Sequence, residues 1–183
     1  MSSERIKSLG FFDYPRSTDI PYLFKKDYND PTLRNPEMCA KCGGECCKRC
    51  GCFFSPDDFK EVSYESLKAE MARGYITIEH VDLDMYNMVG YAWVVRVRNQ
   101  SDPVVVSSVY HRPNSPCVML GPDGCKFDWE HRPAGGKLLK PDNGLMCDSD
   151  YTLRQTVREW QRYQNILYML AEYFSEEDIP CTL

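Results

Sequence analysis

The chain lacks any long apolar run, and this absence excludes a membrane-spanning helix. The longest unbroken apolar stretch covers residues 91–95, far short of the roughly 20 residues that a bilayer requires. Residues 1–14 also contain no apolar segment of signal-peptide length and include Asp13. We therefore expect an uncleaved N-terminus and a cytoplasmic protein.

Positive charge is in short supply, with 22 basic against 27 acidic residues and a net charge of −5. Such a chain repels phosphate backbones, so a nucleic-acid partner is not expected. The sequence also lacks a Gly-rich phosphate loop, an HExxH motif, a nucleophile elbow and a Ser/His/Asp order. The carboxylates of Asp82 and Asp84 are expected to be solvated loop charges. Whether the protein is an enzyme is left open, because no catalytic residue is identified.

Cysteine, in contrast, is abundant, with 10 in 183 residues. Cytoplasmic thiols stay reduced, so clustered cysteines there indicate metal ligands or redox groups rather than disulfides. Two C-x-x-C-G motifs occur close together, at 39–43 and 47–51. Two intervening residues allow both sulfurs to reach one ion, and the following glycine tolerates a left-handed turn. Two such motifs with further cysteines between them are strong evidence for a metal.

Three more cysteines lie in the turn-rich segment 111–148, which has no evident regular structure and needs another means of support. Ligation by Cys117 and Cys125 would tie this segment to the cysteine block. Nine cysteines exceed the four that one tetrahedral ion needs, and the adjacent side chains of Cys46 and Cys47 are expected to diverge. Two four-sulfur sites or one polynuclear cluster therefore fit better than one ion. The predicted ligands are Cys39, Cys42, Cys46, Cys47, Cys50, Cys52, Cys117, Cys125 and Cys147, with Cys181 as a spare.

Thiolate ligands select zinc, iron–sulfur clusters or Cu(I) over magnesium and calcium. Zinc is the first expectation, and iron or an iron–sulfur cluster is the alternative. The cysteine spacings of bacterial ferredoxins and of radical-SAM enzymes are both absent. His80, His111 and His131 are candidate nitrogen ligands, although a lone histidine is usually structural.

The expected fold is α+β: a small, irregular, metal-stabilised single domain over 37–183, preceded by a Pro- and aromatic-rich arm over 1–36. The arm is expected to pack on the core, with docking of a protein partner as the alternative. Helix-start signals predict two short helices near 56–61 and 64–73. A strand is expected at 75–80, and a β-hairpin at 89–98 and 104–110.

A long C-terminal helix is the clearest predicted element. Thr152 and Gln155 form a capping-box pattern, and the helix should run to about Phe174. Its apolar stripe is Leu153, Val157, Trp160, Leu167, Leu170 and Phe174. Three arginines fall on another face at helical spacing; they are interpreted as a solvated face, or alternatively as a clamp for a carboxylate or phosphate. They are Arg154, Arg158 and Arg162.

The order of these motifs resembles a family of zinc- or iron-chelating cysteine-cluster proteins, the CxxCxxCC or YkgJ type. The resemblance covers about 37–150 and rests on the block 39–47, the Ser-Pro-Asp-Asp-Phe of 55–59, Cys117 with Cys125, and the His-Arg-Pro of 131–133. Two departures stand out. Three residues rather than two precede the adjacent cysteine pair, and the cysteine that many members carry after Arg-Pro is missing, so we expect Cys147 to replace it.

Taken together, the sequence predicts a cytoplasmic metalloprotein with two metal sites, at least one of them structural. The alternatives are an iron-dependent enzyme acting on a peptide or small molecule, and a metal-stabilised protein-interaction module. Metal ions are the expected partners, and no membrane partner is expected.

Overall fold

The computed structural model describes residues 26–28, 33, 37, 41–83, 90–107, 115–140, 147–149 and 151–176. Helices and strands both contribute to one small domain with a β-hairpin and a long C-terminal helix, so the predicted α+β class is confirmed. The first half contains α3 (Glu45–Arg49), η2 (Pro56–Asp58), α4 (Tyr64–Ala72), β1 (Ile76–Asp82), β2 (Tyr91–Val97) and β3 (Val105–Ser107). The second half contains β4 (Leu120–Gly121), β5 (Gly124–Cys125), α5 (Ala134–Lys137), β6 (Leu139–Lys140), β7 (Asp148–Ser149), α6 (Leu153–Trp160), η5 (Gln161–Tyr163) and α7 (Gln164–Glu176).

The main sheet has the strand order β2-β1-β3. The predicted hairpin of 89–98 with 104–110 is wrong in its pairing. Strand β2 forms its hairpin with β1, in antiparallel register with Ile78 opposite Val95. Strand β3 instead lies parallel to β1 on its other edge. The connection after β2 therefore crosses the end of β1, and β3 joins the sheet on the far side of β1 instead of pairing with β2.

The predicted helix starts are confirmed by their caps. Ser55 and Asp58 form a reciprocal capping box at η2, and the Ser63 hydroxyl accepts a hydrogen bond from the Ser66 amide at α4. The first helix is a single 3₁₀ turn, shorter than expected. At α6, Thr152 accepts from the Gln155 amide, but the Gln155 side chain turns to Glu159. Within the described ranges, no helix is long and apolar enough to cross a membrane.

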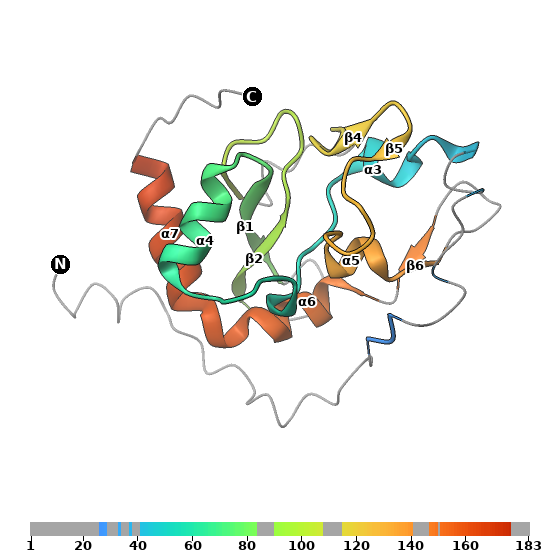
Figure 1. Ribbon diagram of the computed structural model, residues 1–183. Coiled ribbons are helices and arrows are strands. Elements are labelled where there is room, and N and C mark those ends of the chain that lie inside the picture. The colour runs from blue at the N-terminus through green and yellow to red at the C-terminus, as the bar shows by residue number, and fades with distance from the viewer. Residues whose placement is uncertain are drawn as a thin grey trace, which may run out of the picture.

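The larger core lies between one sheet face and the helices α4 and α7, which lie side by side in Figure 1. Ile76, Ile78, Val95 and Val97 point to this side. Most of the predicted C-terminal stripe is buried, with Trp160, Leu167 and Leu170 fully inaccessible and Val157 and Phe174 nearly so. Leu153 is only half-buried, and the 3₁₀ turn η5 interrupts what was predicted as one continuous helix. Since apolar burial is the main favourable term in folding, this packing fixes the sheet on the helices.

The opposite sheet face contains a buried ion-pair network centred on Arg96. The guanidinium binds Glu79 through Nε and Asp102 Oδ2 through Nη2, the latter at 2.8 Å. All three side chains are at least nine-tenths buried. Asp102 Oδ2 also accepts from the Asn99 amide, so the network holds the turn after β2.

The segment 111–148 has more regular structure than the sequence indicated. It contains the small ladders β4–β5 and β6–β7 and the one-turn helix α5. Two of the described residues of the N-terminal arm pack beside this region. Leu33 is buried with Leu138 and Tyr151, and Tyr28 packs against the same group.

Candidate functional site

Four of the predicted ligands come together as one group of thiols. The thiols of Cys46 and Cys47 lie 4.0 Å apart, and electrostatic interaction links Cys47 to Cys117 and Cys125 as well. Cys47 and Cys117 are buried, whereas Cys46 and Cys125 are half-buried. We call these four residues the thiol cluster.

Backbone contacts bring the two halves of the cluster together. Helix α3, which carries Cys46 and Cys47, starts after Gly44 in a left-handed conformation with φ of 78°. The Cys117 amide donates to the Cys47 carbonyl at 2.7 Å. Cys125 lies in the β4–β5 ladder, which Figure 1 shows beside α3. A Cβ on Gly44 would come within 2.8 Å of Leu120, so glycine permits this close approach.

Interactions within the thiol cluster shift the pKa values of its four thiols. Hydrogen bonding from Cys47 lowers the pKa of Cys46 to about 7 and that of Cys125 to about 6. The same interaction lowers the pKa of Cys117. The pKa of Cys47 is raised, because its proton is shared with Cys117, Cys125 and Cys46 and because it is buried. The lowered pKa of these three thiols increases their thiolate fraction, and the thiolate is the form that binds metals.

The expectation that Cys46 and Cys47 diverge is wrong, because their Sγ atoms lie 4.0 Å apart. In a tetrahedral zinc–thiolate site with Zn–S of about 2.3 Å, two sulfurs are about 3.8 Å apart. Nevertheless, within the part of the chain that the structure describes, no three His, Cys, Asp or Glu side chains are already arranged to hold one metal ion.

Cys50 and Cys52 lie close to the cluster, on the strand-like segment that flanks β2. Electrostatic interaction links both to Cys46 and Cys117, and burial raises the pKa of Cys52. Gly51 between them lies against β2: a Cβ there would sit 1.9 Å from the Val97 carbonyl oxygen. The glycine is needed for this close approach and not for a left-handed turn, whereas Gly43 after the first motif does have a φ of 61°.

The remaining predicted and candidate ligands are Cys42, Cys147, the histidines and residues outside the described ranges. Cys42 directly precedes Gly43, and Cys147 directly precedes β7. His80 stacks on Tyr91, and the exposed His131 contacts the Asp128 carboxylate through Nδ1 at 2.7 Å. Cys39, Asp84, His111 and Cys181 fall outside the described residues.

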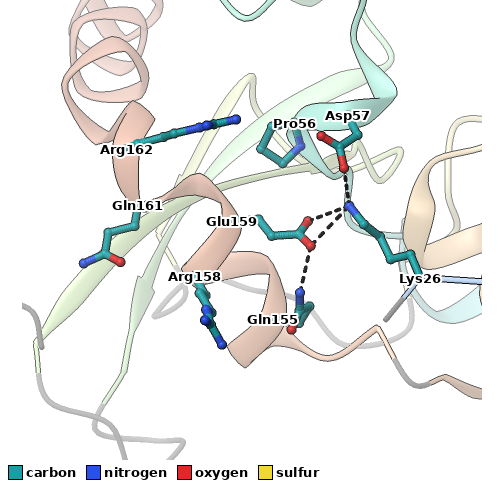
Figure 2. A pocket seen from close by; sticks show the side chains of 8 residues that line it. All are labelled: Lys26, Pro56, Asp57, Gln155, Arg158, Glu159, Gln161 and Arg162. Carbon is teal, nitrogen blue, oxygen red and sulfur yellow. Dashed lines mark hydrogen bonds and ion pairs between the residues drawn. The ribbon is translucent and has the colours of Figure 1, made fainter. Parts of the chain in front are cut away.

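A second polar site surrounds Glu159 and was not predicted from the sequence. A cavity of about 530 Å³ opens between residue 26, helix η2 and the segment 155–162 (Figure 2). Its lining includes Arg158 and Arg162, two of the arginines interpreted above as a solvated face. The third, Arg154, is exposed on the same helix.

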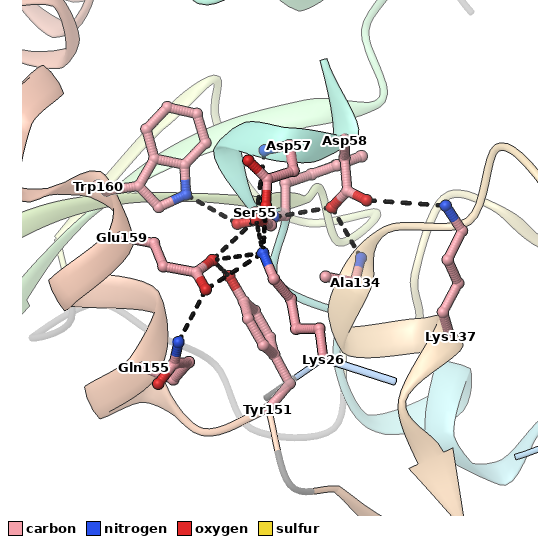
Figure 3. A network of polar contacts seen from close by, with 11 residues as sticks. Lys26, Ser55, Asp57, Asp58, Ala134, Lys137, Tyr151, Gln155, Glu159 and Trp160 are labelled. Atoms are coloured by element: carbon pink, nitrogen blue, oxygen red, sulfur yellow. Dashed lines mark hydrogen bonds and ion pairs between the residues drawn. The ribbon is translucent and has the colours of Figure 1, made fainter. Parts of the chain in front are cut away.

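One carboxylate organises the wall of this cavity (Figure 3). Glu159 Oε2 accepts from the Ser55 hydroxyl at 2.8 Å and the Tyr151 hydroxyl at 2.7 Å. Lys26 also contacts this oxygen, at 3.2 Å, and Gln155 Nε2 donates to Oε1 at 2.8 Å. Both oxygens of the Glu159 carboxylate therefore have hydrogen-bond partners within the protein.

Lys26 donates to Ser55 Oγ at 2.7 Å, an arrangement that invites comparison with a catalytic Ser–Lys pair. Burial lowers the pKa of Lys26, but its hydrogen bond to Asp57 and the charge of Glu159 outweigh burial, and the pKa is raised. A protonated lysine is not a base, so the pair does not activate a nucleophile. Its role is to join the arm to η2 and α6.

No family model, no curated protein and no solved structure matches this chain. The resemblance to cysteine-cluster proteins described from the sequence therefore stays a prediction.

Proposed function

We propose that the protein is a cysteine-cluster metalloprotein in which Cys46, Cys47, Cys117 and Cys125 bind one soft metal ion. Zinc is the first candidate for this ion and iron is the second. The observation that carries the proposal is the close approach of these segments: the Sγ atoms of Cys46 and Cys47 lie 4.0 Å apart, and the Cys117 amide donates to the Cys47 carbonyl. A metal would replace the shared protons, and a four-thiolate ligand set suits zinc or iron.

Two further observations support this ligand set. The Sγ separation of 4.0 Å between Cys46 and Cys47 is close to the edge of a tetrahedral site, so little movement is needed. The side-chain Oδ1 of Asn99 accepts a hydrogen bond from the Gly51 amide, and the Asn99 backbone forms an isolated β-bridge with Cys117. The buried Nδ2 of Asn99 has no hydrogen-bond partner among the described residues. A donor of this kind commonly supports the sulfurs of a metal site.

The remaining predicted ligands would form a second site. Cys50 and Cys52 are its nearest members, and Cys39, Cys42 and Cys147 complete the set predicted from the sequence. In this arrangement the first site is structural, because it joins helix α3 to the β4–β5 ladder. Because cysteines stay reduced in the cytoplasm and can serve there as thiolate ligands, this function fits the predicted cytoplasmic location.

Elemental analysis with absorption spectroscopy tests the proposal on protein purified without oxygen. We expect a colourless protein with one or two zinc ions per chain. A brown protein with iron and visible charge-transfer bands would identify an iron–sulfur centre instead. Protein that remains metal-free after incubation with zinc and with ferrous iron would contradict the proposal.

An iron-dependent enzyme is the second candidate. Cys46 and Cys125 are only half-buried, so one side of the thiol cluster faces solvent and a substrate has access to it. Iron bound with fewer than four protein ligands would favour this alternative over a closed structural site.

Metal removal should loosen the cluster region before the C-terminal helix. The segment 115–127 is held by scattered loop hydrogen bonds, such as that from the Lys126 amide to the Met119 carbonyl, and by the proposed ligation. Helix α7 is held by the buried residues Leu167 and Leu170. Hydrogen exchange with and without a chelator should therefore show lost protection at 115–127 first. Equal loss in both regions would contradict a local role for the metal.

A further inference from the structure

We infer that Asn99 sets the affinity and reduction potential of the proposed metal site by donating a hydrogen bond from its side-chain amide to the sulfur of Cys117. The inference rests on the proposed function, because this sulfur is one of the four proposed ligands. Asn99 does not bind the metal itself. It is a positioning residue that acts through the Cys117 thiolate.

Asn99 and Cys117 face each other across a short antiparallel pairing, in which they form an isolated β-bridge. Backbone hydrogen bonds flank this pair on both sides, from the Val118 amide to the Arg98 carbonyl at 3.0 Å and from the Gln100 amide to the Pro116 carbonyl at 2.8 Å. This pattern makes Asn99 and Cys117 a non-hydrogen-bonded pair, in which the two side chains lie on the same face and approach most closely. The Asn99 amide is therefore a direct neighbour of the Cys117 thiol.

One end of the Asn99 amide is already fixed. Its Oδ1 accepts a hydrogen bond from the Gly51 amide at 2.7 Å, which assigns the orientation of the amide and leaves Nδ2 as the remaining donor. The residue is completely buried, and Nδ2 has no hydrogen-bond partner among the described residues. Because a buried donor without a partner is destabilising, an acceptor that forms beside it is stabilised.

Metal binding at Cys117 would supply this acceptor. A neutral thiol accepts hydrogen bonds only weakly, whereas hydrogen bonds to an ionised acceptor are shorter and stronger. Metal ligation requires the thiolate form of Cys117. Its sulfur already has one donor, the Met119 amide at 3.4 Å, and Asn99 provides the second. Hydrogen bonds to a metal-bound sulfur stabilise its negative charge, which raises the reduction potential of an iron site.

NMR of the full chain loaded with an NMR-active cadmium isotope tests the inference directly. Amide protons that donate to a metal-bound sulfur show a scalar coupling to the cadmium across the hydrogen bond. We expect this coupling for the side-chain amide of Asn99 and, as an internal control, for the backbone amide of Met119. Absence of coupling at Asn99 in cadmium-loaded protein would overturn the inference, and coupling at Met119 in the same spectrum would leave the proposed function standing. Protein that binds no cadmium would contradict the proposed function and the inference with it.

A matched pair of amide-to-carboxylate substitutions measures the size of the effect. Asn99→Asp keeps an oxygen for the Gly51 amide but replaces the donor by an acceptor, so zinc affinity should fall about 10–100-fold. The reduction potential of the iron-loaded variant should also fall. Gln100→Glu makes the same chemical change at an exposed neighbour and should leave both values unchanged. Equal effects of the two variants would overturn the inference. If Asn99→Asp does not fold, the coupling measured on the unmodified protein decides alone.

Discussion

Replacing Cys47 by serine is expected to abolish stoichiometric metal binding. Cys47 is the member of the thiol cluster that interacts electrostatically with each of the other three, and a hydroxyl is a poor, hard substitute for a thiolate. Binding of zinc to a structural site contributes on the order of 10–16 kcal/mol to folding, so the variant should also melt at a much lower temperature. Elemental analysis and thermal unfolding measure the two effects.

The matched control is Cys181→Ser, because Cys181 is the cysteine predicted to be a spare. It should retain the full metal content. If the Cys47 variant does not accumulate, Cys125→Ser provides the second test, since that side chain is half-buried and its loss creates no cavity in the core. Full metal content in both the Cys47 and Cys125 variants would show that the thiol cluster is not the site.

The second large effect is expected at Arg96. Replacing it by methionine leaves Glu79 and Asp102 buried without their common partner. Breaking a buried ion pair by removing one member typically costs about 3–5 kcal/mol, so the free energy of unfolding should fall by about that amount. Urea unfolding of metal-loaded protein measures the change, provided that the transition is two-state.

Arg73→Met is the control for that measurement. Arg73 pairs with Glu70 at 3.3 Å, but its side chain is 65% exposed. Exposed ion pairs contribute about 0–1 kcal/mol, so this variant should stay within about 0.5 kcal/mol of the parent. Equal effects of the two substitutions would show that the Arg96 network does not stabilise the fold.

Local signals were sufficient for the three helix starts that were predicted, but not for α3 and α5, which were not. Ser55, Ser63 and Thr152 each begin a helix because a short polar side chain captures an amide that the first turn leaves unpaired. The burial of Trp160 and Leu167 follows from their spacing along the C-terminal helix. These predictions succeeded because every contact that they require is set by residues a few positions apart, or by one apolar face.

Strand pairing and the polar site could not be predicted in the same way. Nothing local to residues 104–107 distinguishes β2 from β1 as a partner, and the choice follows from a turn that the buried Asp102 holds. Lys26 and Glu159 meet across 133 positions, and the sequence contains no sign of that contact. The four cysteines of the thiol cluster are among the predicted ligands, but which of the predicted cysteines lie together is decided by tertiary contacts such as the hydrogen bond from the Cys117 amide to the Cys47 carbonyl.

Gly51 shows how a steric constraint can imitate a functional one. Gly51 is not a proposed ligand. A methyl side chain at this position would nevertheless collide with the Val97 carbonyl oxygen and push the cysteine segment off the sheet. In a saturation library it would tolerate as little variation as the cysteines on either side of it. Intolerance to substitution in this segment therefore has two causes: the space available to the backbone at Gly51 and the chemistry of the neighbouring cysteine thiols. Only chemical rescue, such as added metal restoring a weakened cysteine variant but never a Gly51 variant, would separate them.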